Sequence, residues 1–209
     1  MNPPLATPML DSDEGVRSDW RIMTFEERYA RNRGAISAEE CAILEKKRVG
    51  VIGCGGLGGY IVEMLARVGV GHLMLVDRDV FEASNLNRQI LCTMAALGRP
   101  KVDVARARVA EVNPFVEVEA RCIALDGGNA DAIIAGCDCV VDALDSLDAR
   151  RVLAAACARE AIPLVTGGIA GWNGQVGVIW PGDGSADILF PPDAADEERA
   201  ARKRAGSLS

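Results

Sequence analysis

The sequence VGVIGCGGLGGYIVEMLARVGVGHLMLVDRDV spans residues 49–80 and decides the fold of this chain. It begins with an apolar run, continues with Gly53, Gly55 and Gly58 in the spacing G-x-G-x-x-G, and then shows helical periodicity. Glycine at these positions lets the backbone turn tightly and approach a phosphate group closely. The N–H groups that open the following helix then face the anion. The stretch predicts a strand, a phosphate-binding loop that includes Gly56, and a helix.

A second apolar run, residues 72–76, ends at Asp77, where a carboxylate can hold a ribose hydroxyl about twenty residues after the glycines. This pattern alone predicts a Rossmann-like nucleotide-binding unit, which an NAD or FAD enzyme would share. The glycines are followed by Gly59 and Tyr60 rather than by lysine and a hydroxyl residue. A P-loop kinase is therefore excluded.

Strands and helices are predicted to alternate through the rest of the chain. The predicted helices cover residues 37–47, 57–68, 100–112, 128–135 and 146–160, and the predicted strands cover 48–53, 72–77, 116–120, 139–141, 162–166 and 175–180. This alternation indicates an α/β fold with a doubly wound, mainly parallel sheet. In such a sheet the ligand site lies at the carboxyl ends of the strands.

The composition fits one domain with a substantial core. Of the 209 residues, 49% are hydrophobic and only 4% are aromatic. We expect a disordered tail at 1–18, a single domain at 19–190 that opens with an amphipathic helix at 19–33, and a charged tail at 191–209, which could include a short helix. We find no signal peptide and no apolar run of ~18–20 residues, so a cytoplasmic protein without a membrane partner is expected. The net charge of −7 makes a nucleic-acid partner unlikely.

Charged residues follow several of the predicted strands. Asp79 follows Asp77, Lys101 opens a helix, and Asp145 follows the strand at 139–141, while Arg88 lies in the loop between. Cations beside a glycine loop can neutralise the charge that develops on a departing pyrophosphate. One carboxylate, here Asp145, can hold Mg²⁺ together with phosphate oxygens and water. This set favours a nucleoside triphosphate with its metal over a dinucleotide.

Five spaced motifs together resemble a known family. They are GCGGLGG at 53–59, VDRDVFEASNLNRQ at 76–89, GRPK at 98–101, NP at 113–114 and VDALDS at 141–146. The chain resembles the MoeB/ThiF/HesA adenylyltransferases, bacterial relatives of ubiquitin-activating enzymes, from about Arg28 to about Pro181. RYARN at 28–32 and IPLVTGGIAGWNGQV at 162–176 are similar to further family elements.

The resemblance implies ATP-dependent adenylation of the C-terminal carboxylate of a small ubiquitin-like sulfur carrier, or of another carboxylate acceptor. It also implies a homodimer, because Arg31 matches an arginine that reaches into the neighbouring subunit's site. The roles implied for the other residues are ribose binding by Asp77 with Asp79 nearby, phosphate or ribose contacts by Asn85, Arg88 and Gln89, phosphate binding by Lys101, and Mg²⁺ binding by Asp145.

Some features depart from the family pattern. Many members carry two CxxC pairs for a structural zinc, whereas here Cys137 and Cys139 are separated by a single residue, so no structural zinc is expected. The chain stops soon after Pro181, which suggests a shortened member. Trp172, Asn173 and Gln175 either line the acceptor side of the cleft or form a packing loop.

Three alternative functions remain. One is a tRNA threonylcarbamoyladenosine dehydratase, which the acidic balance disfavours. The second is a truncated, non-catalytic nucleotide-binding scaffold, and the third is an NAD-dependent oxidoreductase.

Overall fold

A computed structural model describes residues 24–32, 34–170 and 172–190 of the chain. Its helices are α1 (Phe25–Arg28), α2 (Ala38–Leu44), α3 (Gly58–Val68), α4 (Lys101–Val112), α5 (Ala130–Ile134), α6 (Leu147–Arg159) and α7 (Ser185–Leu189), with 3-10 turns η2 (Ala83–Asn85) and η3 (Met94–Ala96). Its strands are β1 (Arg48–Ile52), β2 (His72–Val76), β3 (Glu117–Arg121), β4 (Cys139–Asp142), β5 (Leu164–Ala170) and β6 (Asn173–Ile179).

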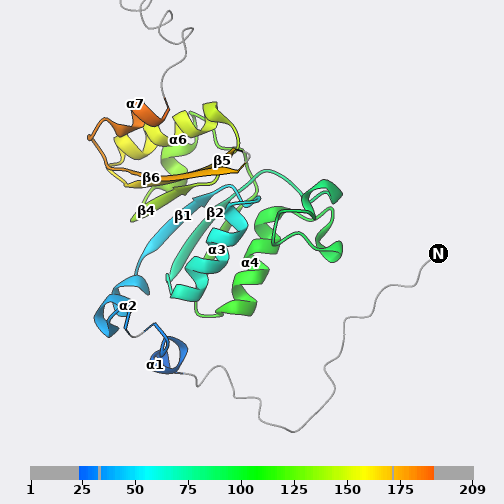
Figure 1. Cartoon of the computed structure of the whole chain (residues 1–209), viewed down its shortest axis with the longest axis vertical. Coiled ribbons are helices and arrows are strands. Elements are labelled where there is room, and N and C mark those ends of the chain that lie inside the picture. Colours follow the sequence, from blue (N-terminus) through cyan, green and yellow to red (C-terminus); the bar gives the residue numbers. More distant parts are fainter. Residues whose placement is uncertain (1–23, 33, 171, 191–209) are drawn as a thin grey trace, which may run out of the picture.

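The six strands form one sheet in the order β3-β2-β1-β4-β5-β6 (Figure 1). Neighbouring strands from β3 to β5 are parallel, and only β6 runs antiparallel to β5. The predicted doubly wound, mainly parallel α/β fold is therefore confirmed. The strand order reverses between β1 and β4, and ligands of such sheets bind outside the carboxyl ends of the strands at this reversal point.

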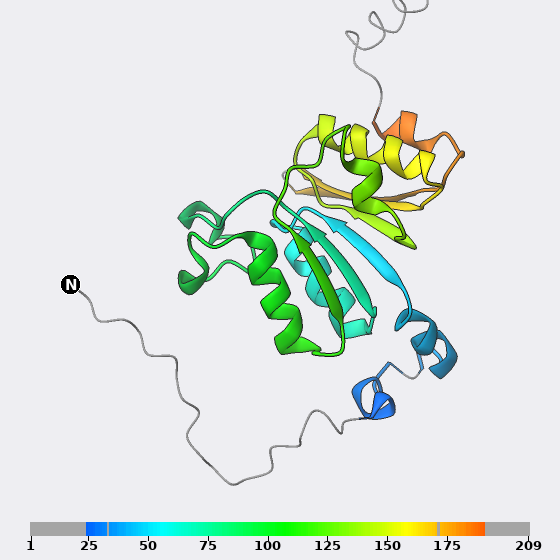
Figure 2. The ribbon, with the colours of Figure 1, turned by 180° about the vertical axis from the view of Figure 1, so that it is seen from behind.

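Helices pack on both faces of the sheet (Figures 1 and 2). Val49 and Val51 of β1 belong to a core shared with α3 and α4, while Ile52 faces a second core shared with α5 and α6. Burial of a valine or isoleucine side chain contributes about 1.5–3 kcal/mol, so both faces stabilise the sheet. Strands covered on both faces are nearly continuous apolar runs, and β1 and β2 are apolar after their first residues, Arg48 and His72.

Several element boundaries differ from the predictions. The first capped helix ends at Leu44 rather than Lys47, because the Lys47 carbonyl accepts a hydrogen bond from the N–H of His72, the first residue of β2. The helix predicted at 128–135 covers only Ala130–Ile134, since Asp126 and Asn129 hold the preceding residues in a turn.

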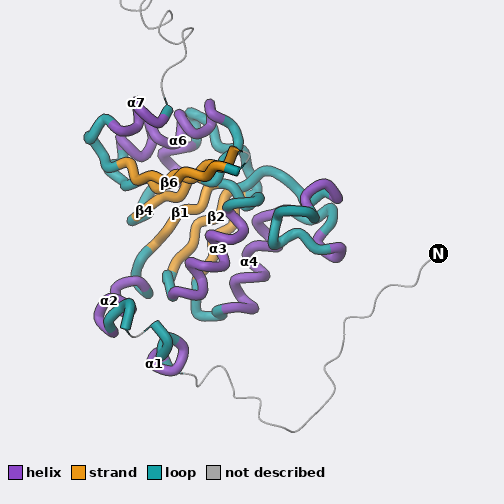
Figure 3. Tube along the Cα trace, in the orientation of Figure 1, coloured by secondary structure: helices purple, strands orange, loops and turns teal. Residues whose placement is uncertain are grey.

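The largest difference is at the carboxyl side of the sheet, where β5 extends to Ala170 through a segment predicted as a loop. It pairs with β6 along its whole length, from Leu164 opposite Ile179 to Ala170 opposite Asn173 (Figure 3). Residues 162–176 therefore form most of a β-hairpin, in which the glycines at 167 and 168 are strand residues.

Some of the predictions for the two ends of the chain fall on residues outside the described ranges. The predicted tails, 1–18 and 191–209, lie there, as does most of the helix predicted at 19–33, of which the structure describes one helical turn, Phe25–Arg28. Among the described helices, none has both the length and the apolar character that crossing a membrane would require.

Candidate nucleotide site

The glycine loop lies at the carboxyl end of β1, against the turn that follows β4. Gly53 has a φ of 101°, and a Cβ atom there would lie 2.5 Å from the carbonyl oxygen of Ala143. A Cβ atom on Gly58 would lie 1.9 Å from the carbonyl oxygen of Gly53. Both positions therefore require glycine, and the sequence spacing reflects close contact between the loop, the first turn of α3 and the β4 turn.

Asp77 organises the loop from the end of β2. One carboxylate oxygen accepts a hydrogen bond from the Cys54 N–H at 2.7 Å, and the other accepts one from the Asp79 N–H at 2.8 Å. A carboxylate offers about four acceptor positions, so these two bonds leave capacity for a ribose hydroxyl. The predicted ribose-binding residue thus also fixes the backbone of the glycine loop.

Lys101 is a buried cation beside this loop. Its side chain is 8% exposed, and its Nζ lies 3.1 Å from a carboxylate oxygen of the exposed Asp79. The Lys101 N–H also donates to the Asp79 carbonyl at 3.0 Å. Since an ammonium group has three donors and Asp79 accepts one of them, the same group can also bind a phosphate oxygen.

Arg88 and Gln89 lie over the glycines. The Arg88 Cγ is 3.9 Å from the position of a Cβ on Gly56, and the Gln89 amide is 3.7 Å from that of a Cβ on Gly55. Gln89 is buried, and its Oε1 has no hydrogen-bond partner among the described residues. Buried polar atoms are nearly always satisfied in folded proteins, so this acceptor is available to a donor group of a ligand or to a water molecule.

Asn85 is placed differently from the other predicted site residues. Its side chain is buried, and its Oδ1 accepts a hydrogen bond from the Glu82 N–H at 3.1 Å to cap η2. Its Nδ2 donates to the Ser84 hydroxyl at 3.4 Å. The structure therefore shows Asn85 shaping the loop that carries Arg88 and Gln89.

Asp145 is exposed just before α6, at the edge of a cavity of about 530 Å³. The other wall of this cavity is the β5–β6 hairpin, which contributes Gly168, Gly174 and Gln175. Asn173 also lines it, whereas Trp172 is fully exposed to solvent. Residues Asn173 and Gln175 are thus on the cleft side of the hairpin, and Trp172 is not.

Sequence reasoning did not find a polar network that lies under the turn carrying Asp145. Asp142 is fully buried at the end of β4 and contacts Thr166 of β5 and Arg150 of α6. Burial raises the pKa of the Asp142 carboxyl, and the Thr166 hydroxyl bond opposes that rise. The sequence around Arg150 does not single it out as a site residue, because α6 also carries Arg151 and Arg159.

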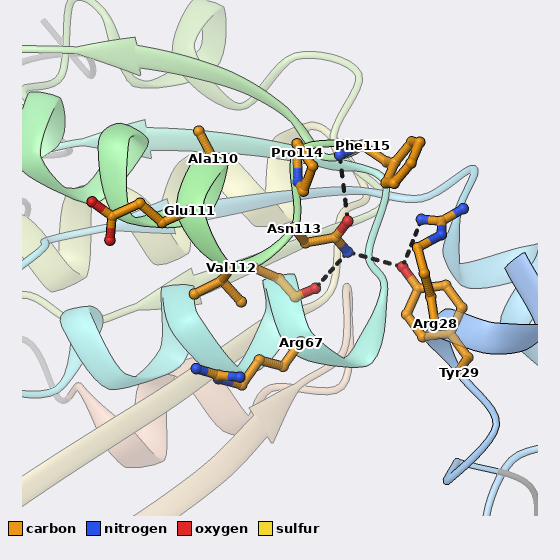
Figure 4. Close-up of a pocket in the computed structure, with 10 residues that line it drawn as sticks. Arg28, Tyr29, Arg67, Ala110, Glu111, Val112, Asn113, Pro114 and Phe115 are labelled. Atoms are coloured by element: carbon orange, nitrogen blue, oxygen red, sulfur yellow. Dashed lines mark hydrogen bonds between the residues drawn. The ribbon is translucent and has the colours of Figure 1, made fainter. Parts of the chain in front are cut away.

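A second cavity, of about 440 Å³, lies at the C-terminal end of α3, the end away from the glycine loop (Figure 4). Asn113 donates to the Tyr29 hydroxyl and to the Ala66 carbonyl, both at 2.9 Å, and the Arg28 guanidinium lies 3.9 Å from the centre of the Phe115 ring. The RYARN and NP motifs therefore contact each other. Their polar groups bind one another, as in a packing contact.

Arg31 lies near this far end and is exposed. Tyr29, two residues earlier, packs against Gly69 at the C-terminal end of α3, whereas the glycine loop precedes that helix. An eleven-residue helix is about 16 Å long. Arg31 is thus not brought to the glycine loop of its own chain, unlike Arg88 and Lys101.

The residues present are compatible with Mg·ATP. Among the described residues, no group of three or more His, Cys, Asp or Glu side chains could hold a metal by itself. Mg²⁺ does not require such a cage, since one or two carboxylates plus phosphate oxygens and water suffice. The Gln89 acceptor, the bare surface of Gly55 and Gly56 and the buried Lys101 fit a nucleotide with its phosphates.

Comparison with known proteins places the chain among named relatives. The chain is 40% identical over 167 residues to the SAMP-activating enzyme E1 of Haloferax volcanii, covering 79% of this chain and 62% of that protein. It is 37% identical over 154 residues to the sulfur carrier protein ThiS adenylyltransferase of Escherichia coli, covering 73% and 61%. The chain thus spans about three fifths of the length of these relatives.

Among solved structures, the E. coli tRNA N6-threonylcarbamoyladenosine dehydratase in complex with ATP is similar, with a TM-score of 0.69 and 30% identity. The match covers 76% of this chain and 65% of that one. The sequence model of the ThiF family matches residues 29–208. Because that match includes most of the chain and all of the site, the protein belongs to the ThiF family.

Proposed function

We propose that this chain is an ATP-dependent adenylyltransferase. It activates the C-terminal carboxylate of a small ubiquitin-like sulfur-carrier protein by forming an acyl-adenylate and releasing pyrophosphate. The observation that carries the proposal is the buried Lys101, whose ammonium lies beside the glycine loop and is paired only with the exposed Asp79 among the described residues. A buried cation at the mouth of a phosphate loop suits a triphosphate.

The nucleotide would lie along the glycine loop. Asp77 and the Gln89 Oε1 are acceptors, which suits ribose hydroxyls rather than phosphate oxygens. Arg88 now donates to the Ser84 carbonyl at 2.9 Å and to the Asn87 side chain at 3.1 Å, which are neutral partners. Exchange of these partners for a phosphate oxygen gives a charge-assisted bond of roughly twice the strength.

The reaction is an in-line attack of the acceptor carboxylate on the α-phosphorus of ATP. The new bond joins a carboxylate oxygen to that phosphorus. The bond from the α-phosphorus to the oxygen that bridges it to the β-phosphorus breaks, and this oxygen leaves with pyrophosphate. Lys101 and Arg88 stabilise the charge that accumulates on the leaving group. Asp145 would hold Mg²⁺, which supplies further neutralisation of the phosphate oxygens when bound. Positioning and charge stabilisation account for the rate, without a covalent intermediate on the protein.

The acceptor would enter through the cavity between Asp145 and the β5–β6 hairpin. Gly168 and Gly174 in its wall carry no side chains, so an extended peptide end could lie close to the backbone there. The position of Arg31, at the far end of α3, suits a contribution to the site of a second subunit. We therefore propose a homodimer as the active form.

Pyrophosphate exchange into ATP tests the proposed reaction directly. The chain with Mg·ATP and a sulfur carrier that ends in Gly-Gly should exchange labelled pyrophosphate, and a carrier with a blocked C-terminus should not. Lys101→Met keeps most of the buried volume but removes the charge, so exchange should fall by about 100-fold or more. Lys46→Met, which changes an exposed lysine after α2, is the matched control.

Two results would contradict the proposal. One is stabilisation of the chain by NAD and not by Mg·ATP in a thermal-shift assay. The other is ATP consumption that depends on threonylcarbamoyladenosine in tRNA and not on any carrier, which would assign the chain to the dehydratases instead.

A further inference from the structure

Asp142, Thr166 and Arg150 form a buried polar network beneath the turn that carries Asp145. The Thr166 hydroxyl donates to the Asp142 Oδ2 at 2.6 Å, and the Arg150 Nη1 lies 3.3 Å from the same oxygen. Asp142 is completely buried, and the Arg150 side chain is only 15% exposed. The three residues come from β4, β5 and α6, so the network joins three elements at the carboxyl end of the sheet.

The network holds both polar groups of one backbone residue, Leu144. The Leu144 N–H donates to the Asp142 Oδ1 at 3.0 Å, and the Leu144 carbonyl accepts from the Nε of Arg150 at 2.9 Å and from its Nη2. The peptide group that joins Leu144 to Asp145 is therefore fixed in orientation.

The residue before Leu144 is fixed as well, from the side of the glycine loop. The Ala143 N–H donates to the Ile52 carbonyl at 2.9 Å, and the Ala143 carbonyl is in close contact with Gly53. The backbone of Ala143 and Leu144 thus has one side bonded to the network and the other against β1 and its loop. It holds the turn that leads to Asp145.

A buried carboxylate and guanidinium are costly for a purely structural contact. Removing two charges from water carries a desolvation penalty of several kcal/mol per ion, and an apolar set of similar volume is often at least as stable. Val140 and Val141, which precede Asp142 in β4, and Leu153 of α6 are buried members of the two apolar cores, which shows that apolar packing is available to these elements. The presence of Asp142 and Arg150 is explained if they orient the Leu144 backbone, which apolar side chains could not do.

We infer that Asp142, Arg150 and Thr166 are positioning residues that set the placement of the Asp145 carboxylate toward the glycine loop. This inference rests on the proposed function, because it assigns to Asp145 the metal-binding role in adenylation. None of the three needs to touch the nucleotide, since Asp142 and Arg150 bond the Leu144 backbone and Thr166 acts through Asp142.

Thr166→Val is the most informative variant, because it removes the hydroxyl and keeps the shape. We expect the Leu144 amide, which donates to Asp142, to exchange hydrogen faster in the ligand-free variant, measured by NMR. The turnover of pyrophosphate exchange should fall by about tenfold or more, since small misplacements of reacting groups are costly. The Mg²⁺ concentration for half-maximal activity should rise, while the KM for ATP changes little. Thr166→Ser should restore all three properties.

Arg150→Met and Arg159→Met form a matched pair on α6. Arg159 is 52% exposed and pairs with Asp131, away from the site. Its replacement should therefore leave amide hydrogen exchange and pyrophosphate-exchange activity unchanged. Arg150→Met should behave like Thr166→Val.

The inference is overturned if amide exchange in Thr166→Val and Arg150→Met matches that of the wild type. It is also overturned if amide hydrogen exchange accelerates but the Mg²⁺ concentration for half-maximal activity does not change, because the network would then be structural only. Failure of the proposed function is seen separately, as absence of Mg·ATP binding and pyrophosphate exchange in the wild type.

Discussion

Replacement of Gly58 by alanine should destabilise the whole domain, although alanine favours helices. Gly58 is the first residue of α3, and a Cβ atom there would lie 1.9 Å from the Gly53 carbonyl oxygen and 2.7 Å from the Gly53 carbonyl carbon. The nearer contact is about 1 Å shorter than the 3.0 Å below which real Cβ atoms are essentially never found. Both atoms are backbone atoms, so the strain cannot be relieved by a rotamer change.

The magnitude follows from two opposing terms. Alanine gains at most about 1 kcal/mol over glycine in a helix interior, and less at the first turn. Forced overpacking with backbone displacement costs about 1–3 kcal/mol and sometimes more. The Gly53 carbonyl is also held by contact of its own residue with Ala143, so the loop cannot retreat freely. The net loss should be about 2 kcal/mol or more, which lowers Tm by about 4–8 °C for a domain of this size.

Urea and thermal denaturation of Gly58→Ala and Gly56→Ala measure this loss. Gly56 lies in the same loop, but the nearest heavy atom to its Cβ position is the Arg88 Cγ at 3.9 Å, an ordinary contact. Gly56→Ala should therefore unfold within about 0.5 kcal/mol of the wild type. Equal stability of Gly58→Ala and the wild type would refute the close packing of loop and helix described here.

Three further predictions concern regions outside the loop. Hydrogen bonds from Arg108 and a second arginine lower the pKa of Glu63 from 4.5 to about 2, so its stabilisation is present above pH 4.5 and is lost as the pH falls toward 2. Glu63→Gln should lower the free energy of unfolding by about 1–2 kcal/mol at pH 7, a modest loss because the two arginines are partly exposed to solvent. The urea midpoints of variant and wild type should converge by pH 2–3, and a difference that stays constant with pH would contradict this. Asn113→Ala should lower stability by about 2 kcal/mol in thermal denaturation, since it removes the buried donor to Tyr29, and an unchanged Tm would argue against that contact. Of the seven thiols, Cys122 is the exposed one, so a thiol reagent should modify one cysteine quickly in the native state, and a fast thiol remaining in Cys122→Ser would show otherwise.

The sequence allowed prediction of the segments whose structure depends on local sterics. β1, the glycine loop, α3 and β2 followed from apolar runs and from glycines that no other residue could replace, such as Gly53 with its positive φ. The motifs also predicted site roles for Arg88, Gln89, Lys101 and Asp77; the structure places these residues near the loop, and their contacts with a nucleotide stay a prediction.

The remaining features depend on contacts between distant residues. Gly167 suggested a loop, yet it lies in a strand because β6 pairs with it and the Leu57 side chain occupies the space of a Cβ at 2.8 Å. Asn85 was expected to contact the nucleotide, and that role stays a prediction; the sequence did not reveal that its carboxamide caps a 3-10 turn. Arg150 resembles its neighbouring arginines in sequence, and only the meeting of α6 with β4 and β5 distinguishes it.

The junction of Gly53 with Ala143 has a consequence for the order of folding events. These residues are 90 positions apart, whereas β1 meets β2 after only a short helix. Contacts of large sequence separation carry a higher loop-closure cost and form late in slow-folding topologies. In a partly folded chain in which only β1, α3 and β2 have formed, the glycine loop would be present, but the turn after β4 that packs against it would be missing. Nucleotide binding would then begin only when β4 enters the sheet, so that ATP acts as a probe of that step of refolding.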